Sequence, residues 1–264
     1  MLSKLKILGI IPSRMKASRF PNKPMVKILG IPMVAHCFER SLLAKLVDEV
    51  YVATCDKEIF DFFKSHNGKV VMTQDTHNRA SERTHEALHL IESIEKKTYD
   101  IIVMIQGDEP TLNPNMIDEV VKPLIDENKN LVSNLMVKLS NLEDIINPNN
   151  VKVVTSKSNN ALYFSREPIP SGGLEKDNVF YFRQLGLIAF RRKSLIDFES
   201  LKPSILEISE SIDMNRYLEN DYPVYMMESK LNSKCVDVPE DLEGVINDMR
   251  KDSFLKNYSA KYES

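Results

Sequence analysis

One segment of this sequence, residues 101–105 (IIVMI), contains no polar residue and restricts the fold more than any other feature. A strand that is apolar on both faces is typical of the middle of a parallel sheet covered by helices on both sides. The chain before it alternates between strand-like and helix-like patterns, with strands expected over 6–11, 49–54 and 69–73 and helices over 32–46, 57–66 and 82–97. This alternation predicts an α/β fold with a doubly wound, mostly parallel sheet.

The pattern changes in the second half of the chain. A helix over 116–127 and a strand over 131–137 are followed by a turn-rich segment (147–150), two short strands (151–155 and 161–165) and a loop (168–173). We interpret the segment from this turn to this loop (147–173) as an insertion or dimerisation arm on the sheet. The remaining expected elements are a strand over 182–190, a helix over 205–219, a strand over 222–228 and a terminal helix over 239–250, after which the charged last dozen residues are expected to fray.

The composition excludes several classes of protein. No apolar run approaches the roughly 20 residues of a membrane span, and the N-terminal sequence lacks the features of a secretory signal. Cys37, Cys55 and Cys235 show neither metal-ligand spacing nor a disulfide framework, which predicts a cytoplasmic protein. His85 and His89 lie four residues apart on an expected helix and are interpreted as surface polar residues.

Positive charge is concentrated at the start of the chain. Seven basic residues precede the first carboxylate, Glu39, and they are Lys4, Lys6, Arg14, Lys16, Arg19, Lys23 and Lys27. The whole chain carries a net charge of −3 from 35 basic and 38 acidic residues, so the remainder has 28 against 38, or −10. A cationic segment on an acidic body favours a small polyanionic ligand over nucleic acid, although a solvated basic turn is the alternative.

The loop over residues 12–24 follows the first expected strand, where ligands of open parallel sheets bind. It lacks the glycines and the GK[ST] ending of a P-loop. Its three prolines restrict the backbone and lower the cost of holding Arg14, Arg19 and Lys23 around phosphates.

Two carboxylates follow other expected strands. Asp108 lies in QGDEP directly after the apolar strand, with Gln106 and Glu109 beside it, and Asp237 lies in CVDVPEDL before the terminal helix. Each has a simpler interpretation as a turn or helix-capping residue. Together with the cationic loop, they predict a site for a nucleotide with Mg²⁺.

The order of motifs along the chain resembles that of the CMP-Kdo synthetase family, the 3-deoxy-manno-octulosonate (Kdo) cytidylyltransferases. The motifs are IIPSRMKASRFPNKPM, VATCD, MTQDTHNRASERTHEAL, IQGDEP, NPNNVKVV, ALYFSREPIP, QLGLIAF and VDVPEDLEGV, and the match covers about residues 5–250. The resemblance implies a nucleotidyltransferase fold and a homodimer that binds neither nucleic acid nor membrane. It also implies Mg²⁺-dependent transfer of CMP from CTP to an acidic sugar, for cell-surface polysaccharides such as lipopolysaccharide or capsule.

The resemblance also implies roles for single residues and for parts of the chain. One domain over residues 1–264 would comprise a nucleotide-binding half over about 1–140 and an acceptor-binding and dimerisation half over about 141–250. Asp108 and Asp237 would be the metal ligands, and with Arg14 and Lys23 they would form the catalytic set. The nucleotide-binding residues would be Pro12, Ser13, Arg14, Arg19, Lys23, Ser81, Arg83 and Gln106. The acceptor-binding residues would be Arg166, Gln184, Asp213 and Met214.

The acceptor end departs from the family's usual motifs. Where the family commonly reads HLGIYGYR, this chain reads QLGLIAFR, so Gln184 replaces a histidine and Ile188 a tyrosine. Asp213 and Met214 likewise stand where an acid and a glutamine are common. Unmatched buried polar groups cost about 1–3 kcal/mol each, so these acceptor-end changes favour a different acid, such as a nonulosonate, an amino-sugar acid or a phosphonate. In the nucleotide-binding stretch, Ala80 and Ser81 stand where a Gly-Thr pair is common. Two other interpretations compete. The first is a glycosyltransferase, which should carry an Asp-x-Asp metal motif that QGDEP does not match, and the second is a non-catalytic nucleotide-binding protein.

Overall fold

The computed structural model describes residues 4–16, 19–127, 129–172 and 179–262. Ala17 and Ser18 of the basic loop and Gly173 of the expected loop over 168–173 lie outside the described residues. The chain forms two compact units: unit 1 comprises Met1–Asp118 and Asn232–Ser264, and unit 2 comprises Glu119–Leu231. None of the described helices has the length and apolar character needed to span a membrane.

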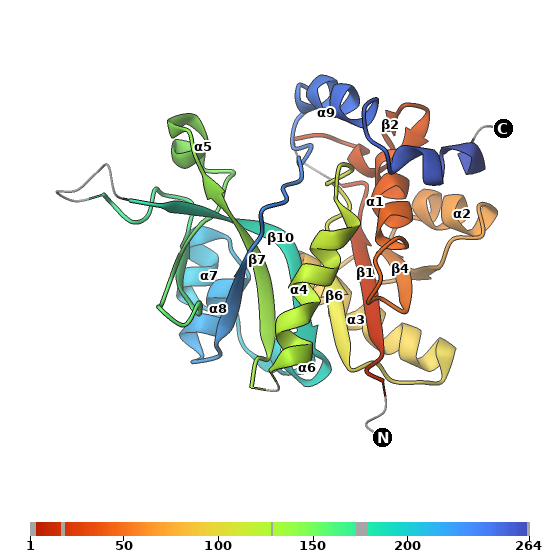
Figure 1. Cartoon of the computed structure of the whole chain (residues 1–264). Coiled ribbons are helices and arrows are strands. Elements are labelled where there is room, and N and C mark those ends of the chain that lie inside the picture. Colours follow the sequence, from red (N-terminus) through yellow and green to blue (C-terminus); the bar gives the residue numbers. More distant parts are fainter. Residues whose placement is uncertain (1–3, 17–18, 128, 173–178, 263–264) are drawn as a thin grey trace. The chain divides into compact units, whose positions relative to one another are not determined.

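Four strands of unit 1 form a parallel arrangement, in the order β6-β1-β4-β5, while β2 (Lys27–Ile28) and β3 (Ile31–Pro32) form a separate antiparallel pair. Figure 1 shows β1 (Ile7–Ser13) and β4 (Glu49–Thr54) side by side, while β6 (Ile101–Met104) pairs with the other edge of β1 and β5 (Val70–Met72) with β4. All four residues of β6 are buried, as their apolar run predicts. The prediction of an α/β fold with a parallel sheet is confirmed.

Helices connect these strands. They are α1 (Met33–Ser41), α2 (Lys57–Ser65) and α3 (Ala80–Glu95), and α4 (Pro114–Asp126) crosses the boundary between the units. Since crossovers between parallel strands are right-handed, α1 and α2 cover one face of the sheet and α3, which returns from β5 to β6, covers the other. Because these strands are parallel, the carboxyl ends of β1, β5 and β6 lie at the same edge of the sheet.

Two expected boundaries in unit 1 are wrong. The first strand runs to Ser13 rather than residue 11, because Pro12 and Ser13 continue the pairing with β4. The first helix ends at Ser41 rather than near residue 46. Its expected last turn is held in another conformation because the Asp118 carboxylate accepts hydrogen bonds from the backbone of Lys45 (3.0 Å) and Leu46 (2.9 Å).

Unit 2 mixes strand directions. Its strand β7 (Val132–Leu139) pairs antiparallel with β10 (Tyr181–Arg191) and parallel with β11 (Val224–Glu228). A hairpin of β8 (Lys152–Thr155) and β9 (Ala161–Ser165) pairs with β10 through β8. Two short helices in this unit, α5 (Leu142–Ile146) and α6 (Arg192–Ser200), have no counterpart among the expected elements.

The single helix expected over 205–219 is wrong, since the structure has two helices there. They are α7 (Ile205–Glu210) and α8 (Met214–Glu219), separated at Ser211, whose φ of 55° is left-handed. The carboxylate of Glu210, the last residue of α7, accepts hydrogen bonds from the hydroxyls of Tyr163 (3.0 Å) and Ser165 (2.8 Å) in β9. These tertiary contacts end α7 at Glu210, although the local sequence pattern predicts that the helix continues.

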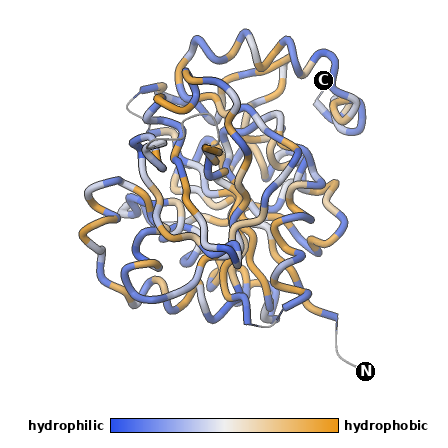
Figure 2. The backbone as a smooth tube through the Cα atoms, turned by 60° about the vertical axis from the view of Figure 1, so that its left-hand side comes forward, coloured by the Kyte–Doolittle hydropathy of each residue, from blue (hydrophilic) through white to orange (hydrophobic). Residues whose placement is uncertain are grey.

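The terminal helix α9 (Asp241–Met249) is amphipathic, and at the top of Figure 2 its turns alternate between hydrophobic and hydrophilic residues. Val245 and Met249 on its apolar face belong to a buried cluster with Ile28, Met33 and Val236. Pro239 and Glu240, which were expected inside this helix, precede it. Through this cluster, α9 supports both the segment after the basic loop and the backbone beside Asp237.

The prediction that the last dozen residues fray is wrong for those that the structure describes. Two 3₁₀ turns, Leu255–Asn257 and Ser259–Tyr262, follow α9. The side chain of Tyr258 is buried, and the Glu39 carboxylate of α1 accepts hydrogen bonds from Lys261 (2.6 Å) and Tyr262 (2.7 Å). This part of the chain is therefore packed onto α1.

We predict that His36 makes unit 1 sensitive to acid. His36 is fully buried on α1, where Nδ1 accepts a hydrogen bond from the Tyr258 hydroxyl and Nε2–H donates to the Ile28 carbonyl, both at 2.9 Å. Burial, with the charge of Arg40 as a lesser cause, lowers the pKa of His36 to about 4. Because the unfolded chain binds this proton below pH ~6.5 and the folded chain does not, stability is lost as the pH falls from ~6.5 towards 4, by up to about 1.4 kcal/mol per unit.

The test compares urea unfolding of the wild type and His36→Gln between pH 7 and pH 4. The variant is expected to be less stable at pH 7 but to lose less stability on acidification. The pKa of His85 is also lowered to about 4, chiefly by burial, so its contribution is common to both proteins and cancels in the comparison. Equal pH slopes for the two proteins would contradict the assignment to His36.

Candidate active site

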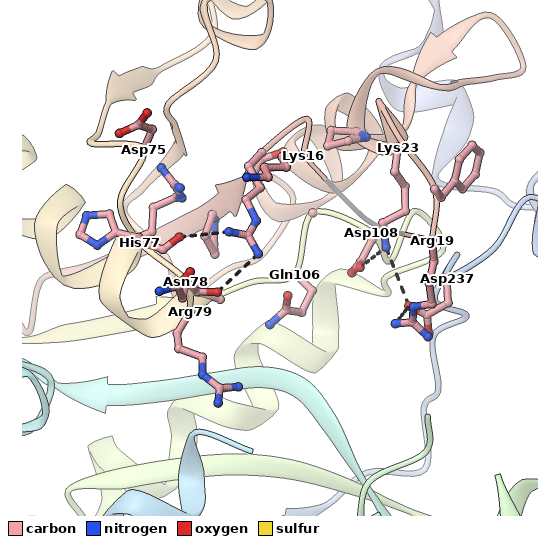
Figure 3. Close-up of a pocket in the computed structure, with 18 residues that line it drawn as sticks. Lys16, Arg19, Lys23, Asp75, His77, Asn78, Arg79, Gln106, Asp108 and Asp237 are labelled. Atoms are coloured by element: carbon pink, nitrogen blue, oxygen red, sulfur yellow. Dashed lines mark hydrogen bonds and ion pairs between the residues drawn. The ribbon is translucent and has the colours of Figure 1, made fainter. Parts of the chain in front are cut away.

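A cavity of about 580 Å³ opens in unit 1 at the carboxyl ends of β1 and β6. This volume is within the range of about 300–1,000 Å³ typical of small-molecule sites. Figure 3 shows its lining side chains, which come from the basic loop, from the segment before α3 and from the turn after β6, with Asp237 on the opposite wall. Six are cationic and three are carboxylates: Arg14, Lys16, Arg19, Lys23, Arg79 and Arg83, and Asp75, Asp108 and Asp237.

The described residues on both sides of the basic loop are held by backbone hydrogen bonds. The amide of Met15 donates to the carboxylate of Asp56 at 2.8 Å, and the amide of Asn22 donates back to the Met15 carbonyl at 3.1 Å. Asn22 has a φ of 60° and precedes a 3₁₀ turn, Lys23–Met25, whose Pro24 is buried. These contacts direct the Lys23 side chain inward (Figure 3).

A second wall is formed by the segment between β5 and α3. The carboxylate of Glu82 accepts hydrogen bonds from the amides of Asn78 (2.9 Å) and Arg79 (3.1 Å), which fixes the start of α3. The Arg14 guanidinium donates to the carbonyls of His77 (3.0 Å) and Asn78 (3.4 Å). The end of β1 and this segment thus hold each other in place across the cavity floor.

The two predicted metal ligands are brought together by backbone contacts. The amide of Val236 donates to the carbonyl of Asp108 at 3.0 Å, and the amide of Lys234 donates to the Thr111 hydroxyl at 2.8 Å. The turn that carries Asp108 lies directly against β1, since a Cβ atom at Gly107 would be only 3.3 Å from the Ile11 side chain. Asp108 and Asp237 consequently face the same space.

Lys23 lies between these two carboxylates. Its Nζ is 2.6 Å from Asp108 Oδ2 and 3.9 Å from Asp237 Oδ1, and it donates a hydrogen bond of 2.8 Å to the Val236 carbonyl. Burial alone would lower the pKa of Lys23, but the charge and hydrogen bond of Asp108 outweigh it and the net pKa is raised. Arg19 reaches Asp237 from the more exposed side, at 3.2 Å.

The donor set suits a hard divalent cation. One ligand atom each from Asp108, Cys235 and Asp237 lies within 4.8 Å of the others. Burial, followed by the nearby carboxylates, raises the pKa of the Cys235 thiol, and Mg²⁺ prefers oxygen to sulfur ligands. Two carboxylates with space beside them match the preference of Mg²⁺, which is usually held by one or two carboxylates together with substrate phosphates.

Two buried polar atoms in the cavity wall have no hydrogen-bond partner among the described residues. They are Ser13 Oγ and Arg83 Nη2, and both residues line the cavity. The rest of the Arg83 guanidinium is engaged, since Nη1 donates to the Thr73 hydroxyl and, at 3.0 Å, to the Gln74 carbonyl. Buried polar groups are normally paired, so a polar ligand in the cavity would complete both.

The structure gathers all but one of the predicted catalytic, metal and nucleotide-binding residues around this cavity. They are Pro12, Ser13, Arg14, Arg19, Lys23, Arg83, Gln106, Asp108 and Asp237. The exception is Ser81, which lies in the first turn of α3 with its side chain fully buried.

Sequence reasoning missed most of the wall before α3. Asp75, His77, Asn78 and Arg79 line the cavity although none was among the predicted site residues, and Lys16 was counted only as a loop cation. The available signal was topological, because this segment follows β5 and ligands bind beyond the carboxyl ends of parallel strands.

The four predicted acceptor-binding residues belong to unit 2. Arg166 donates to the carbonyls of Glu210 and Pro148, both at 2.8 Å, and Gln184 donates to the Asn134 side chain at 2.6 Å. Asp213 precedes α8, and Met214 is buried at the start of that helix. Their predicted roles remain predictions.

Comparison with known proteins identifies the family. Residues 8–230 match the cytidylyltransferase family. A 3-deoxy-manno-octulosonate cytidylyltransferase from Geotalea daltonii is 38% identical over 256 residues, which cover 93% of this chain and 99% of that protein. One from Christiangramia forsetii is 39% identical over 243 residues, covering 91% and 96% respectively.

A solved structure supports the same relationship. It is that of a CMP:2-keto-3-deoxy-manno-octonic acid synthetase complexed with CTP, which is 32% identical to this chain. The two superpose with a TM-score of 0.84, covering 93% of this chain and 99% of the other. This chain belongs to the cytidylyltransferase family, among the 3-deoxy-manno-octulosonate cytidylyltransferases.

Proposed function

We propose that this enzyme transfers CMP from CTP to Kdo with release of pyrophosphate, for the synthesis of a cell-surface polysaccharide. The observation that carries the proposal is a cavity in which a cationic rim faces two adjoining carboxylates, Asp108 and Asp237. The names of the relatives support Kdo as the acceptor, and the related structure complexed with CTP supports CTP as the donor.

In the proposed reaction, a hydroxyl oxygen of the acceptor attacks the α-phosphorus of CTP. A new P–O bond forms to the acceptor, the bond to pyrophosphate breaks, and the hydroxyl proton is released. Such a transfer depends on positioning and charge neutralisation more than on covalent catalysis. Arg14 and Lys23 would neutralise the charge that grows on pyrophosphate, and Arg19 would hold the outer phosphates.

Two further cavity residues are proposed nucleotide ligands because their polar atoms need partners. Ser13 Oγ would donate a hydrogen bond to a phosphate or ribose oxygen, and Arg83 Nη2 would donate to another oxygen of the nucleotide. Gln106, at the end of β6, offers both a donor and an acceptor to the base or the sugar.

Asp108 and Asp237 are the proposed ligands of Mg²⁺. When bound, this ion would offset phosphate charge and acidify a coordinated hydroxyl. The Val236–Asp108 backbone bond holds together the two segments that carry these carboxylates, so Asp108 and Asp237 would hold the cation between them.

We further propose that unit 1 binds the nucleotide and that unit 2 supplies the acceptor-binding residues Arg166, Gln184, Asp213 and Met214. A second acceptor class deserves a direct test, because the sequence departs from the common family motifs at Gln184, Ile188, Asp213 and Met214. Ile188 and Met214 are buried, and the Gln184 amide already donates to Asn134. Neither buried side chain can replace the hydrogen bonds of a tyrosine or a glutamine.

The protein is proposed to act in the cytoplasm as a homodimer, as the family resemblance implies. Its three cysteines are free thiols, which suits a reducing compartment. Unit 2 exposes large apolar side chains that a partner subunit could cover, including Leu142, Leu162, Phe180, Ile205 and Ile208. Light scattering at micromolar concentration would test the dimer, and a monomeric mass would refute it.

The function is tested by measuring pyrophosphate release with CTP, Mg²⁺ and a panel of acids that includes Kdo, a nonulosonate, an amino-sugar acid and a phosphonate. Release with Kdo supports the proposal, and mass spectrometry must then find CMP joined to Kdo. Release with another acid alone replaces the acceptor and keeps the chemistry. No release with any acceptor, while CTP still binds, would contradict catalysis itself.

A further inference from the structure

The ammonium group of Lys23 occupies the space between the two proposed metal ligands. It contacts oxygens from Asp108, Asp237 and the Val236 carbonyl at 2.6, 3.9 and 2.8 Å, and only 14% of its side chain is exposed. Figure 3 shows this side chain reaching down from the basic loop to the carboxylates. A divalent ion bound at about 2.0–2.1 Å from the same oxygens would meet this cation directly.

We infer that Lys23 is the internal counter-ion of the metal site, and that the metal binds tightly only after a nucleotide phosphate draws this ammonium group away. The identities of the metal and the nucleotide rest on the proposed function. Without ligand, Lys23 neutralises Asp108 and Asp237 and keeps the pair together. With nucleotide bound, the same cation moves to the phosphates and vacates the carboxylates for the metal.

The local structure allows this exchange without a change of fold. The backbone at Lys23 is anchored by buried Pro24 and by the amide of Val26, which donates to the Lys23 carbonyl at 3.2 Å. Phe20, earlier in the loop, packs against the cluster beneath α9. The lysine side chain has four flexible carbons and carries a compact charge, so it can swing while the backbone of Lys23–Met25 stays in place.

Arg19 is the natural comparison, because it also contacts Asp237. Its Nη2 is 3.2 Å from Asp237 Oδ1, but 53% of its side chain is exposed, against 14% for Lys23. Exposed ion pairs are screened by water and contribute little, whereas a charge in a shielded position excludes a second cation effectively. Lys23, rather than Arg19, is therefore the competitor for the metal.

Competition of this kind couples the two ligands. If nucleotide raises the affinity for metal by removing Lys23, then metal must raise the affinity for nucleotide by the same factor. The metal is consequently loaded together with the nucleotide and binds weakly to the empty site.

The test measures Mn²⁺ binding by electron paramagnetic resonance, since Mn²⁺ also prefers carboxylate and phosphate oxygens. In the absence of nucleotide, Lys23→Gln is expected to bind Mn²⁺ about tenfold more tightly than the wild type, or more, because one shielded positive charge is removed. Lys23→Arg should retain weak binding, and Arg19→Gln should change the affinity less than about threefold. Adding Asp108→Asn to Lys23→Gln should abolish the gain, which locates the ion.

Three results would overturn the inference. They are no tighter Mn²⁺ binding by folded Lys23→Gln, an equal gain in Arg19→Gln, and wild-type protein whose Mn²⁺ affinity is the same with and without CTP. The last measurement needs no variant and so is independent of any folding defect. Because Mn²⁺ binding requires no turnover, failure of the acceptor panel would remove the proposed function and leave the exchange at Lys23 intact.

Discussion

Asp108→Asn is expected to lower turnover about 10³-fold or more while leaving the fold intact. The substitution keeps the size of the side chain but removes one of two charges that would hold Mg²⁺, and a metal ion supplies several kcal/mol of transition-state stabilisation. Each 1.36 kcal/mol corresponds to about tenfold in rate. The Asp108 side chain is 27% exposed, and its backbone carbonyl still accepts the bond from Val236, so the turn should keep its shape.

The measurement is the initial rate of pyrophosphate release at saturating CTP and acceptor. Asp248→Asn is the matched control, since Asp248 carries the same charge on the exposed part of α9 and pairs only with Lys234 among the described residues. The control should retain wild-type turnover, and circular dichroism should be unchanged for both variants. An Asp108→Asn enzyme within tenfold of the wild-type rate would refute the metal assignment.

The position of the site could be predicted because it depends on topology. A buried apolar strand and the alternation around it require a parallel sheet, and the carboxyl ends of parallel strands share one edge. The basic loop after β1 and the QGDEP turn after β6 therefore had to approach each other, since these strands pair directly. Charge then indicated the ligand, because an excess of cations beside two carboxylates suits a nucleotide with its metal.

The contacts inside the site could not be predicted, because they join residues far apart in the chain. Lys23 is 85 residues from Asp108 and 213 residues from Val236, and no local pattern encodes such a pairing. The packing of Tyr258 and Arg40 is hidden for the same reason, since 218 residues separate them. From its sequence alone, the charged C-terminal segment resembles a solvated tail, because no local pattern shows that its aromatic residues pack against α1.

Helix boundaries failed where tertiary contacts outweigh local preference. The sequence over 205–219 favours one continuous helix, yet the chain turns at Ser211 because Glu210 is held by β9 and a new pair of charges forms across the break. That pair joins Glu207 of α7 to Arg216 of α8 through two hydrogen bonds of 2.6 Å. A continuous helix could not bring both groups into this two-point contact.

Arg216→Met is expected to destabilise the protein by about 3–5 kcal/mol, because it leaves the Glu207 charge buried without its partner. The two side chains are only 4% and 2% exposed. Replacing both, as in Arg216→Met with Glu207→Leu, should recover more than half of the loss, since a buried pair can often be exchanged for apolar residues at little cost.

Burial, rather than distance, decides the size of this effect, and unit 2 contains the comparison that tests it. The Lys193–Asp197 pair has a similar separation, 2.5 Å against 2.6 Å, but the Lys193 side chain is 82% exposed. Lys193→Met should therefore leave the urea midpoint unchanged, because water and salt already screen its charge. Two results would contradict the buried Glu207 carboxylate as the cause of the loss. One is an equal urea midpoint for Arg216→Met and Lys193→Met, and the other is a double replacement that is as unstable as Arg216→Met.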